Sequence, residues 1–276
     1  MKYGLDVATI GELFNPKILA ELASEAEDAG WDGFFLWDCF HAYSNRLVEA
    51  TDPWIALSAI AMVTKRIRIG TMVTPLARRR PWKLARETVA LDHLSNGRLV
   101  LGIGLGFRPE DFSNFGEDAD PRVRGEKLDE ALEVLIGLWS GERFSYHGKY
   151  YRVEDVQFLP KPVQSPRIPI WVAGFWPNRR PFRRAAKWDG VYPGAEGTLK
   201  PWDLKTILAY IRRHREPSKP FDVLVFGYTP NDPEKGARIV DPYIEAGATW
   251  WAEGTDYEHR TVKGFRERIR SGPPKP

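Results

Sequence analysis

The chain has 276 residues, of which 43% are hydrophobic and 28% are charged. These values are close to the averages of folded soluble proteins and argue against wholesale disorder. The excess of Lys and Arg (40) over Asp and Glu (37) is only three charges, which is too small for a dedicated nucleic-acid-binding protein. The single cysteine cannot form an internal disulfide, the first residues lack the apolar run of a secretory signal, and no stretch approaches the roughly 20 apolar residues that cross a bilayer. We therefore expect a cytoplasmic protein without membrane or nucleic-acid partners, folded as one domain over residues 1–276.

In chain order, short runs of β-branched or aromatic residues alternate with longer segments of helical periodicity. The predicted strands are Lys2–Val7, Gly33–Leu36, Ile67–Met72, Leu99–Ile103, Ile170–Ala173, Gly190–Tyr192, Asp222–Gly227 and Thr249–Glu253. The predicted helices are Pro16–Ala29, Pro53–Val63, Trp82–Leu94, Arg122–Trp139, Phe182–Lys187, Trp202–His214, Pro233–Ala246 and Thr261–Ile269. Strand-helix repeats require parallel strands covered on both faces, and eight pairs favour a closed (β/α)₈ TIM barrel over an open doubly wound sheet.

One segment breaks the alternation. Residues Phe144–Arg152 predict a β-hairpin that turns near His147 and Gly148, and a proline-rich tract follows from Pro160 to Pro169. We interpret this hairpin as an excursion between the fourth and fifth strand-helix units.

Several common catalytic motifs are missing from the sequence. The five histidines show no metal-hydrolase spacing, and neither a G-x-S-x-G elbow nor a P-loop is present. The glycines Gly102, Gly104 and Gly106 suggest a dinucleotide fingerprint, but that motif belongs on the first strand-helix turn and opens directly into a helix. Here the glycines follow the fourth strand, so we interpret them as a strand-end loop that lets the backbone approach a planar ring.

Four blocks in serial order resemble the bacterial luciferase-like monooxygenase superfamily, across nearly the whole chain. They are Ala29–Asp38 (AGWDGFFLWD), Ile69–Pro75 (IGTMVTP), Leu91–Arg98 (LDHLSNGR) leading into Gly102-Ile103-Gly104, and Pro160–Gln164 (PKPVQ) leading into Ile168–Gly174 (IPIWVAG).

The resemblance implies a flavin- or deazaflavin-dependent oxidoreductase, a monooxygenase or a hydride-transfer enzyme, acting on a small organic substrate. The implied cofactor is FMN or 8-hydroxy-5-deazaflavin (coenzyme F420), with its ring in the C-terminal mouth of the barrel. A non-prolyl cis peptide behind the ring would fall at Thr71-Met72. The ring would also contact Gly104 and Gly106.

The implied phosphate site follows the fifth predicted strand. It comprises Ala173, Gly174 and Phe175, with Arg179 adding charge and Gly194 forming the opposite wall. Phe175 departs from the second glycine that relatives commonly carry. The arginines around positions 78–80 and 179–184 could mark a phosphate ligand, or they could be solvated and paired with surface carboxylates.

Asp38, just after the second strand, is a candidate catalytic residue, with a loop cap as the structural alternative. Many relatives follow this aspartate with a catalytic histidine, but Cys39 occupies that position here. His41 could reach the same space, and Glu110 or Asp111 could donate a proton if burial raises its pKa. We expect no metal in the site.

Two other classes of function remain open from the sequence. One is a non-redox barrel enzyme acting on a phosphorylated metabolite, and the other is a cofactor-binding protein without turnover. The many aromatic residues would suit a homodimer interface, although the sequence also allows a monomer.

Overall fold

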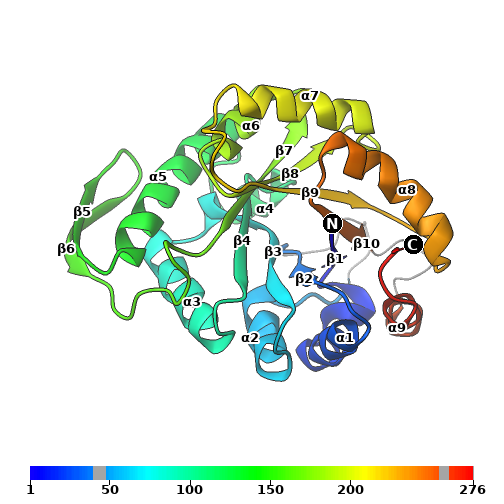
Figure 1. Cartoon of the computed structure of the whole chain (residues 1–276). Coiled ribbons are helices and arrows are strands. Elements are labelled where there is room, and N and C mark those ends of the chain that lie inside the picture. The colour runs from blue at the N-terminus through cyan, green and yellow to red at the C-terminus, as the bar shows by residue number, and fades with distance from the viewer. Residues whose placement is uncertain (40–47, 255–260, 276) are drawn as a thin grey trace.

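The computed structural model describes residues 1–39, 48–254 and 261–275, and it forms a closed barrel of eight parallel strands. The strands follow one another around the barrel in chain order, and the last pairs with the first (Figure 1). Their bounds are β1 Lys2–Val7, β2 Gly33–Leu36, β3 Arg68–Pro75, β4 Leu99–Gly104, β7 Ile170–Trp176, β8 Gly190–Ala195, β9 Asp222–Gly227 and β10 Trp250–Gly254. The predicted TIM barrel is confirmed.

Helices cover the outside of the barrel (Figure 1). The described helices are α1 Pro16–Asp28, α2 Pro53–Val63, α3 Pro81–Leu94, α4 Glu110–Ser113, α5 Pro121–Trp139, α6 Arg179–Ala185, α7 Pro201–Arg212, α8 Pro233–Ala246 and α9 Val262–Arg270, with the 3₁₀ helices η1 Gly11–Phe14 and η2 Leu76–Arg78. The sequence did not predict α4, η1 or η2, which are too short to show a helical period. None of the described helices is long and apolar enough to traverse a membrane.

Helix starts follow from local side-chain chemistry. The Asn15, Asp52 and Asp232 side chains each accept a hydrogen bond from a backbone amide in the first turn of α1, α2 and α8. A proline follows each cap, where its fixed φ is compatible with the helix and its missing N–H leaves no bond unmade.

Large aromatic side chains fill the interior of the barrel below the mouth. The rings of Phe35, Trp171 and Trp250 meet with centroid distances of 5.3–5.9 Å. Strands β3 and β4 approach so closely here that a Cβ on Gly102 would lie 2.0 Å from the Thr71 carbonyl oxygen. This packed layer fills the barrel interior, so a ligand site is expected at the C-terminal ends of the strands.

The predicted excursion is confirmed. Strands β5 (Arg143–His147) and β6 (Arg152–Gln157) form an antiparallel hairpin that projects beyond α5, away from the barrel strands (Figure 1).

The position predicted for the non-prolyl cis peptide is wrong by one residue. The cis bond joins Met72 and Val73, not Thr71 and Met72. Strand β3 continues to Pro75, past the predicted end at Met72, and its pairing with β4 shifts register between Thr71 and Thr74. The irregular backbone therefore lies inside the strand, not at its end.

Candidate functional site

Two adjoining cavities occupy the C-terminal mouth of the barrel. The first lobe, of about 600 Å³, lies among the ends of β2, β3, β4 and β7 and the starts of α4 and α6. The second lobe, of about 620 Å³, lies among the ends of β7, β8, β9 and β10. Each lobe falls within the size range of small-molecule sites. They share the lining residues Trp37, Ala173, Gly174, Phe175 and Tyr192.

One wall of the first lobe is formed by residues of β3 and by two glycines at the end of β4. Met72 and Val73, at the cis bond, contribute from β3, and Gly104 and Gly106 contribute from the end of β4. A Cβ on Gly104 would lie 2.7 Å from the Val73 side chain, and Gly106 adopts a φ of +84° that disfavours other residues. The glycines therefore let neighbouring side chains pack closely against the end of β4.

Asp38 lines the first lobe but is held by two arginines. Its Oδ1 accepts hydrogen bonds from Arg78 (2.9 Å) and Arg79 (2.8 Å), and its Oδ2 accepts one from Arg79 Nε at 3.0 Å. Arg78 also pairs with Asp111 at 3.2 Å, and the side chains of Arg78, Asp38 and Asp111 are at most 4% exposed. Proton transfer to Asp38 would have to disrupt charge-assisted bonds in a buried network, so the geometry favours a structural role.

The other candidate catalytic residues lie in different surroundings. His41 lies outside the described residues. Glu110 is exposed at the start of α4 and is not among the residues lining either lobe, whereas its neighbour Asp111 is buried and lines the first lobe. Cys39 also lines the first lobe, and burial, with the nearby charges of Asp38 and Asp111, raises the pKa of its thiol to about 11.

The predicted cofactor-binding residues lie in three places: in the lining of the lobes, in the barrel interior (Thr71) and in a surface cleft (Arg179). Most of them line the lobes. The first lobe is lined by Met72, Gly104 and Gly106, and the second by Gly194. Both lobes are lined by Ala173, Gly174 and Phe175. Thr71 is fully buried, and its hydroxyl bonds to the Gly102 carbonyl and to Thr74.

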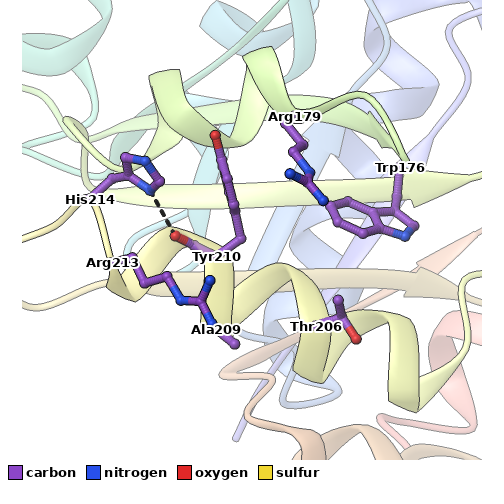
Figure 2. A pocket seen from close by; sticks show the side chains of 7 residues that line it. All are labelled: Trp176, Arg179, Thr206, Ala209, Tyr210, Arg213 and His214. Carbon is purple, nitrogen blue, oxygen red and sulfur yellow. Dashed lines mark hydrogen bonds between the residues drawn. The ribbon is translucent and has the colours of Figure 1, made fainter.

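Arg179 lies in a separate surface cleft between α6 and α7. Figure 2 shows its side chain beside Tyr210, with the guanidinium carbon 5.7 Å from the ring centroid. In the described part of the chain, no lysine or arginine lines either lobe. A phosphate in the first lobe would therefore depend on neutral donors, such as backbone amides and the side chain of Asn178.

A buried carboxyl that the sequence analysis missed is bonded to two residues that line both lobes. Asp6, at the end of β1, is 1% exposed and accepts hydrogen bonds from Trp37 Nε1 (2.9 Å) and from the Tyr192 hydroxyl (2.8 Å). Burial raises the pKa of Asp6 to about 7, although both hydrogen bonds act to lower it. One signal in the sequence could have identified Asp6 as a candidate site residue. It is an acidic residue near the C-terminal end of a mostly apolar barrel strand, where site residues of TIM barrels lie.

Acidic, histidine and cysteine side chains do not gather into a potential metal site anywhere in residues 1–39, 48–254 and 261–275.

The fold and site together define a TIM barrel with two adjoining cavities at the C-terminal ends of its strands. The family model described as luciferase-like monooxygenase matches residues 3–229. The chain belongs to this family.

Curated relatives share about a third of the matched residues. An uncharacterized protein of Mycobacterium tuberculosis is 32% identical over 188 residues, which is 62% of this chain and 64% of that protein. The F420-dependent glucose-6-phosphate dehydrogenase of Amycolatopsis mediterranei is 31% identical over 170 residues, which is 60% of this chain and 50% of that enzyme. The chain thus spans between half and two thirds of the length of these relatives.

Solved structures confirm the fold over the whole chain. An F420-dependent secondary alcohol dehydrogenase, in complex with an F420-acetone adduct, superposes with a TM-score of 0.80 over 98% of both chains at 18% identity. The monooxygenase RslO1 from Streptomyces bottropensis gives a TM-score of 0.77 over 98% of this chain and 97% of its own, at 20% identity.

Proposed function

We propose that this protein is a flavin- or deazaflavin-dependent oxidoreductase that binds FMN or coenzyme F420 in the first lobe and a small organic substrate in the second. The observation that carries the proposal is the pair of adjoining lobes at the C-terminal mouth of the barrel, which share Trp37, Gly174 and Tyr192 among their lining residues. Membership of the luciferase-like family supports it.

The residues of the first lobe fit a three-ring cofactor. Met72, Val73 and Gly104 would support the ring, and the backbone near Gly174 and the side chain of Asn178 would hold its phosphate. When bound, the cofactor supplies hydride transfer or, in its reduced form, reaction with oxygen. The protein positions the substrate against the ring and excludes water from it.

The lining of the second lobe favours a neutral, largely apolar substrate. Phe226, Tyr243 and Trp251 contribute aromatic surface, and the Phe107 and Phe175 rings, 6.0 Å apart, lie at the first lobe's lining. A phosphate in either lobe would meet neutral donors among the described lining residues, whether it belonged to a cofactor or to a phosphorylated metabolite. Turnover of a sugar phosphate by the cofactor-free protein is the observation that would favour the non-redox alternative.

Cofactor binding is the direct test. We expect FMN or F420 fluorescence to be quenched on titration with the purified protein at micromolar concentration. Gly104→Val, whose side chain would occupy the wall beside Val73, should weaken binding by at least about tenfold, or about 1.4 kcal/mol. The control Gly125→Ala should bind normally, because its Cβ would meet no atom closer than 3.7 Å on α5, outside both lobes. Failure of both cofactors to bind the unmodified protein would refute the proposal.

The type of reaction requires a second measurement. Oxygen consumption by protein loaded with reduced cofactor would show monooxygenase or oxidase chemistry. Cofactor reduction by an alcohol without oxygen would show hydride transfer. Tight binding without turnover in either assay would show a cofactor-binding protein.

We also propose a homodimer that uses α2. Ile55, Met62 and Val63 are 65%, 70% and 49% exposed, and their spacing places them along one stripe of this helix. Light scattering of the native protein and of Met62→Lys would test this assembly, and a monomeric native protein would refute it. Cytoplasmic location and a single domain over residues 1–276 stay predictions.

A further inference from the structure

We propose that Tyr192 and Asp6 form a proton relay, in which Tyr192 exchanges a proton with a substrate hydroxyl or carbonyl oxygen and Asp6 holds that proton behind it. This inference rests on the proposed function, and it names the substrate class as a neutral alcohol or carbonyl compound. Tyr192 is suited to the first role because it lines both lobes. Asp6 lines neither lobe and acts through Tyr192, so it is a positioning residue.

The geometry gives the pair a direction. The Tyr192 hydroxyl donates a hydrogen bond to Asp6 Oδ2, with 2.8 Å between the two oxygens. The lone pairs on the phenol oxygen therefore stay free to accept a proton from the substrate. Trp37 Nε1 donates to Asp6 Oδ1 at 2.9 Å, so both carboxylate oxygens are held by neutral donors. The relay joins residues that are 186 positions apart, on strands β1 and β8, which β10 and β9 separate in the barrel.

The surroundings of Asp6 differ from those of Asp38. The residues paired with Asp6 on the adjacent strands are Phe35 and Gly254, which carry no charge. The titratable group that faces it is Tyr192 on β8, whose own pKa is raised by burial, by Asp6 and by Tyr228 after β9. Asp38 is paired with two arginines, whereas the described hydrogen-bond partners of Asp6 are the uncharged side chains of Tyr192 and Trp37, and burial raises its pKa to about 7. Asp6 can therefore gain and lose a proton without breaking an ion pair.

In the oxidation direction, the substrate is an alcohol. The substrate O–H bond breaks and its proton bonds to Tyr192 Oη, while the original Tyr192 proton bonds to Asp6 Oδ2. The substrate C–H bond breaks with both electrons and a C=O bond forms; the oxidised cofactor of the proposed function, when bound, would supply the hydride acceptor. Reduction of a carbonyl compound runs through the same bonds in reverse, with Asp6 starting protonated.

The first test needs no cofactor. Infrared spectroscopy of the protein as a function of pH should show a protonated carboxyl band that disappears with a midpoint near pH 7 and is missing in Asp6→Asn. Tyr192→Phe should move the midpoint upward, because it removes a hydrogen bond that lowers the pKa of Asp6. Tyr243→Phe is the matched control, since its hydroxyl donates to the Leu199 carbonyl and not to Asp6, and it should leave the midpoint unchanged. A missing neutral midpoint, or one unaffected by Tyr192→Phe, would overturn the relay.

The second test uses protein loaded with whichever cofactor binds, with 2-propanol and cyclohexanol as probes. We expect kcat for oxidation to rise with pH through about 7, and Asp6→Asn to lower kcat by at least about a hundredfold and remove this dependence. KM should stay within about threefold of the unmodified value, because the substrate does not touch Asp6. Turnover that Asp6→Asn leaves unchanged would overturn the relay while the proposed function stands. If the unmodified protein binds neither cofactor, the proposed function fails, and the infrared titration still decides whether the pair can carry a proton.

Discussion

Replacing Arg78 by methionine should destabilise the fold far more than replacing an exposed arginine. Arg78 is 1% exposed and pairs with both Asp38 and Asp111, so Arg78→Met removes positive charge from two buried carboxylates. Removal of one partner from a buried ion pair lowers the free energy of unfolding by about 3–5 kcal/mol. We expect a loss near the lower end of this range, because Arg79 would still pair with Asp38 at 2.7 Å.

This loss converts to a measurable shift in Tm. With an unfolding entropy of about 2.1 cal/mol/K per residue, a chain of 276 residues loses about 1.7 °C of Tm for each kcal/mol. Arg78→Met should therefore lower Tm by about 5–6 °C, measured by circular dichroism during heating.

Arg122→Met is the matched control. Arg122 is 79% exposed and pairs with Glu126 on the surface of α5, where an ion pair contributes less than about 1 kcal/mol. Its Tm should fall by less than about 2 °C. Equal shifts for the two variants would refute the assignment of the Arg78 network as a buried structural cluster.

Three further predictions follow from buried titratable groups. Because burial raises the pKa of Asp6 from 3.8 to about 7, folding is favoured by its proton at low pH, and that stability is lost as pH rises toward 7, at up to about 1.4 kcal/mol per pH unit. Asp6→Asn should remove this slope in urea unfolding between pH 4.5 and 7.5, and a variant with the native slope would disprove it. Cys39, the single cysteine, should react with iodoacetamide slowly at pH 8 and faster toward pH 11, since its pKa is raised to about 11; rapid alkylation at pH 8 would count against this. Glu253→Gln should cost about 3 kcal/mol or more in urea unfolding, because it removes the charge that faces buried Arg268 at 3.3 Å, and a loss below about 1 kcal/mol would show that the pair is not stabilising.

Local patterns in the sequence determined the architecture of this protein. The predicted bounds of β1, β2 and β9, and those of α2 and α8, coincide with the structure. Residue periodicity and helix caps are encoded by neighbours in the chain, so they can be read without tertiary contacts. The barrel then placed the strand-end residues Asp38, Gly104 and Gly174 at one mouth, because all parallel strands end on the same side.

Only the tertiary structure decided what those residues contact. Asp38 follows a strand as a catalytic aspartate would, yet Arg78 and Arg79, 40 and 41 positions later, occupy its carboxylate. Asp6 accepts hydrogen bonds from Trp37 and from Tyr192, which are distant from it in the sequence. The protonation of a buried carboxyl depends on desolvation and on the partners that surround it in space, and closure of the barrel supplies both from segments distant in the chain.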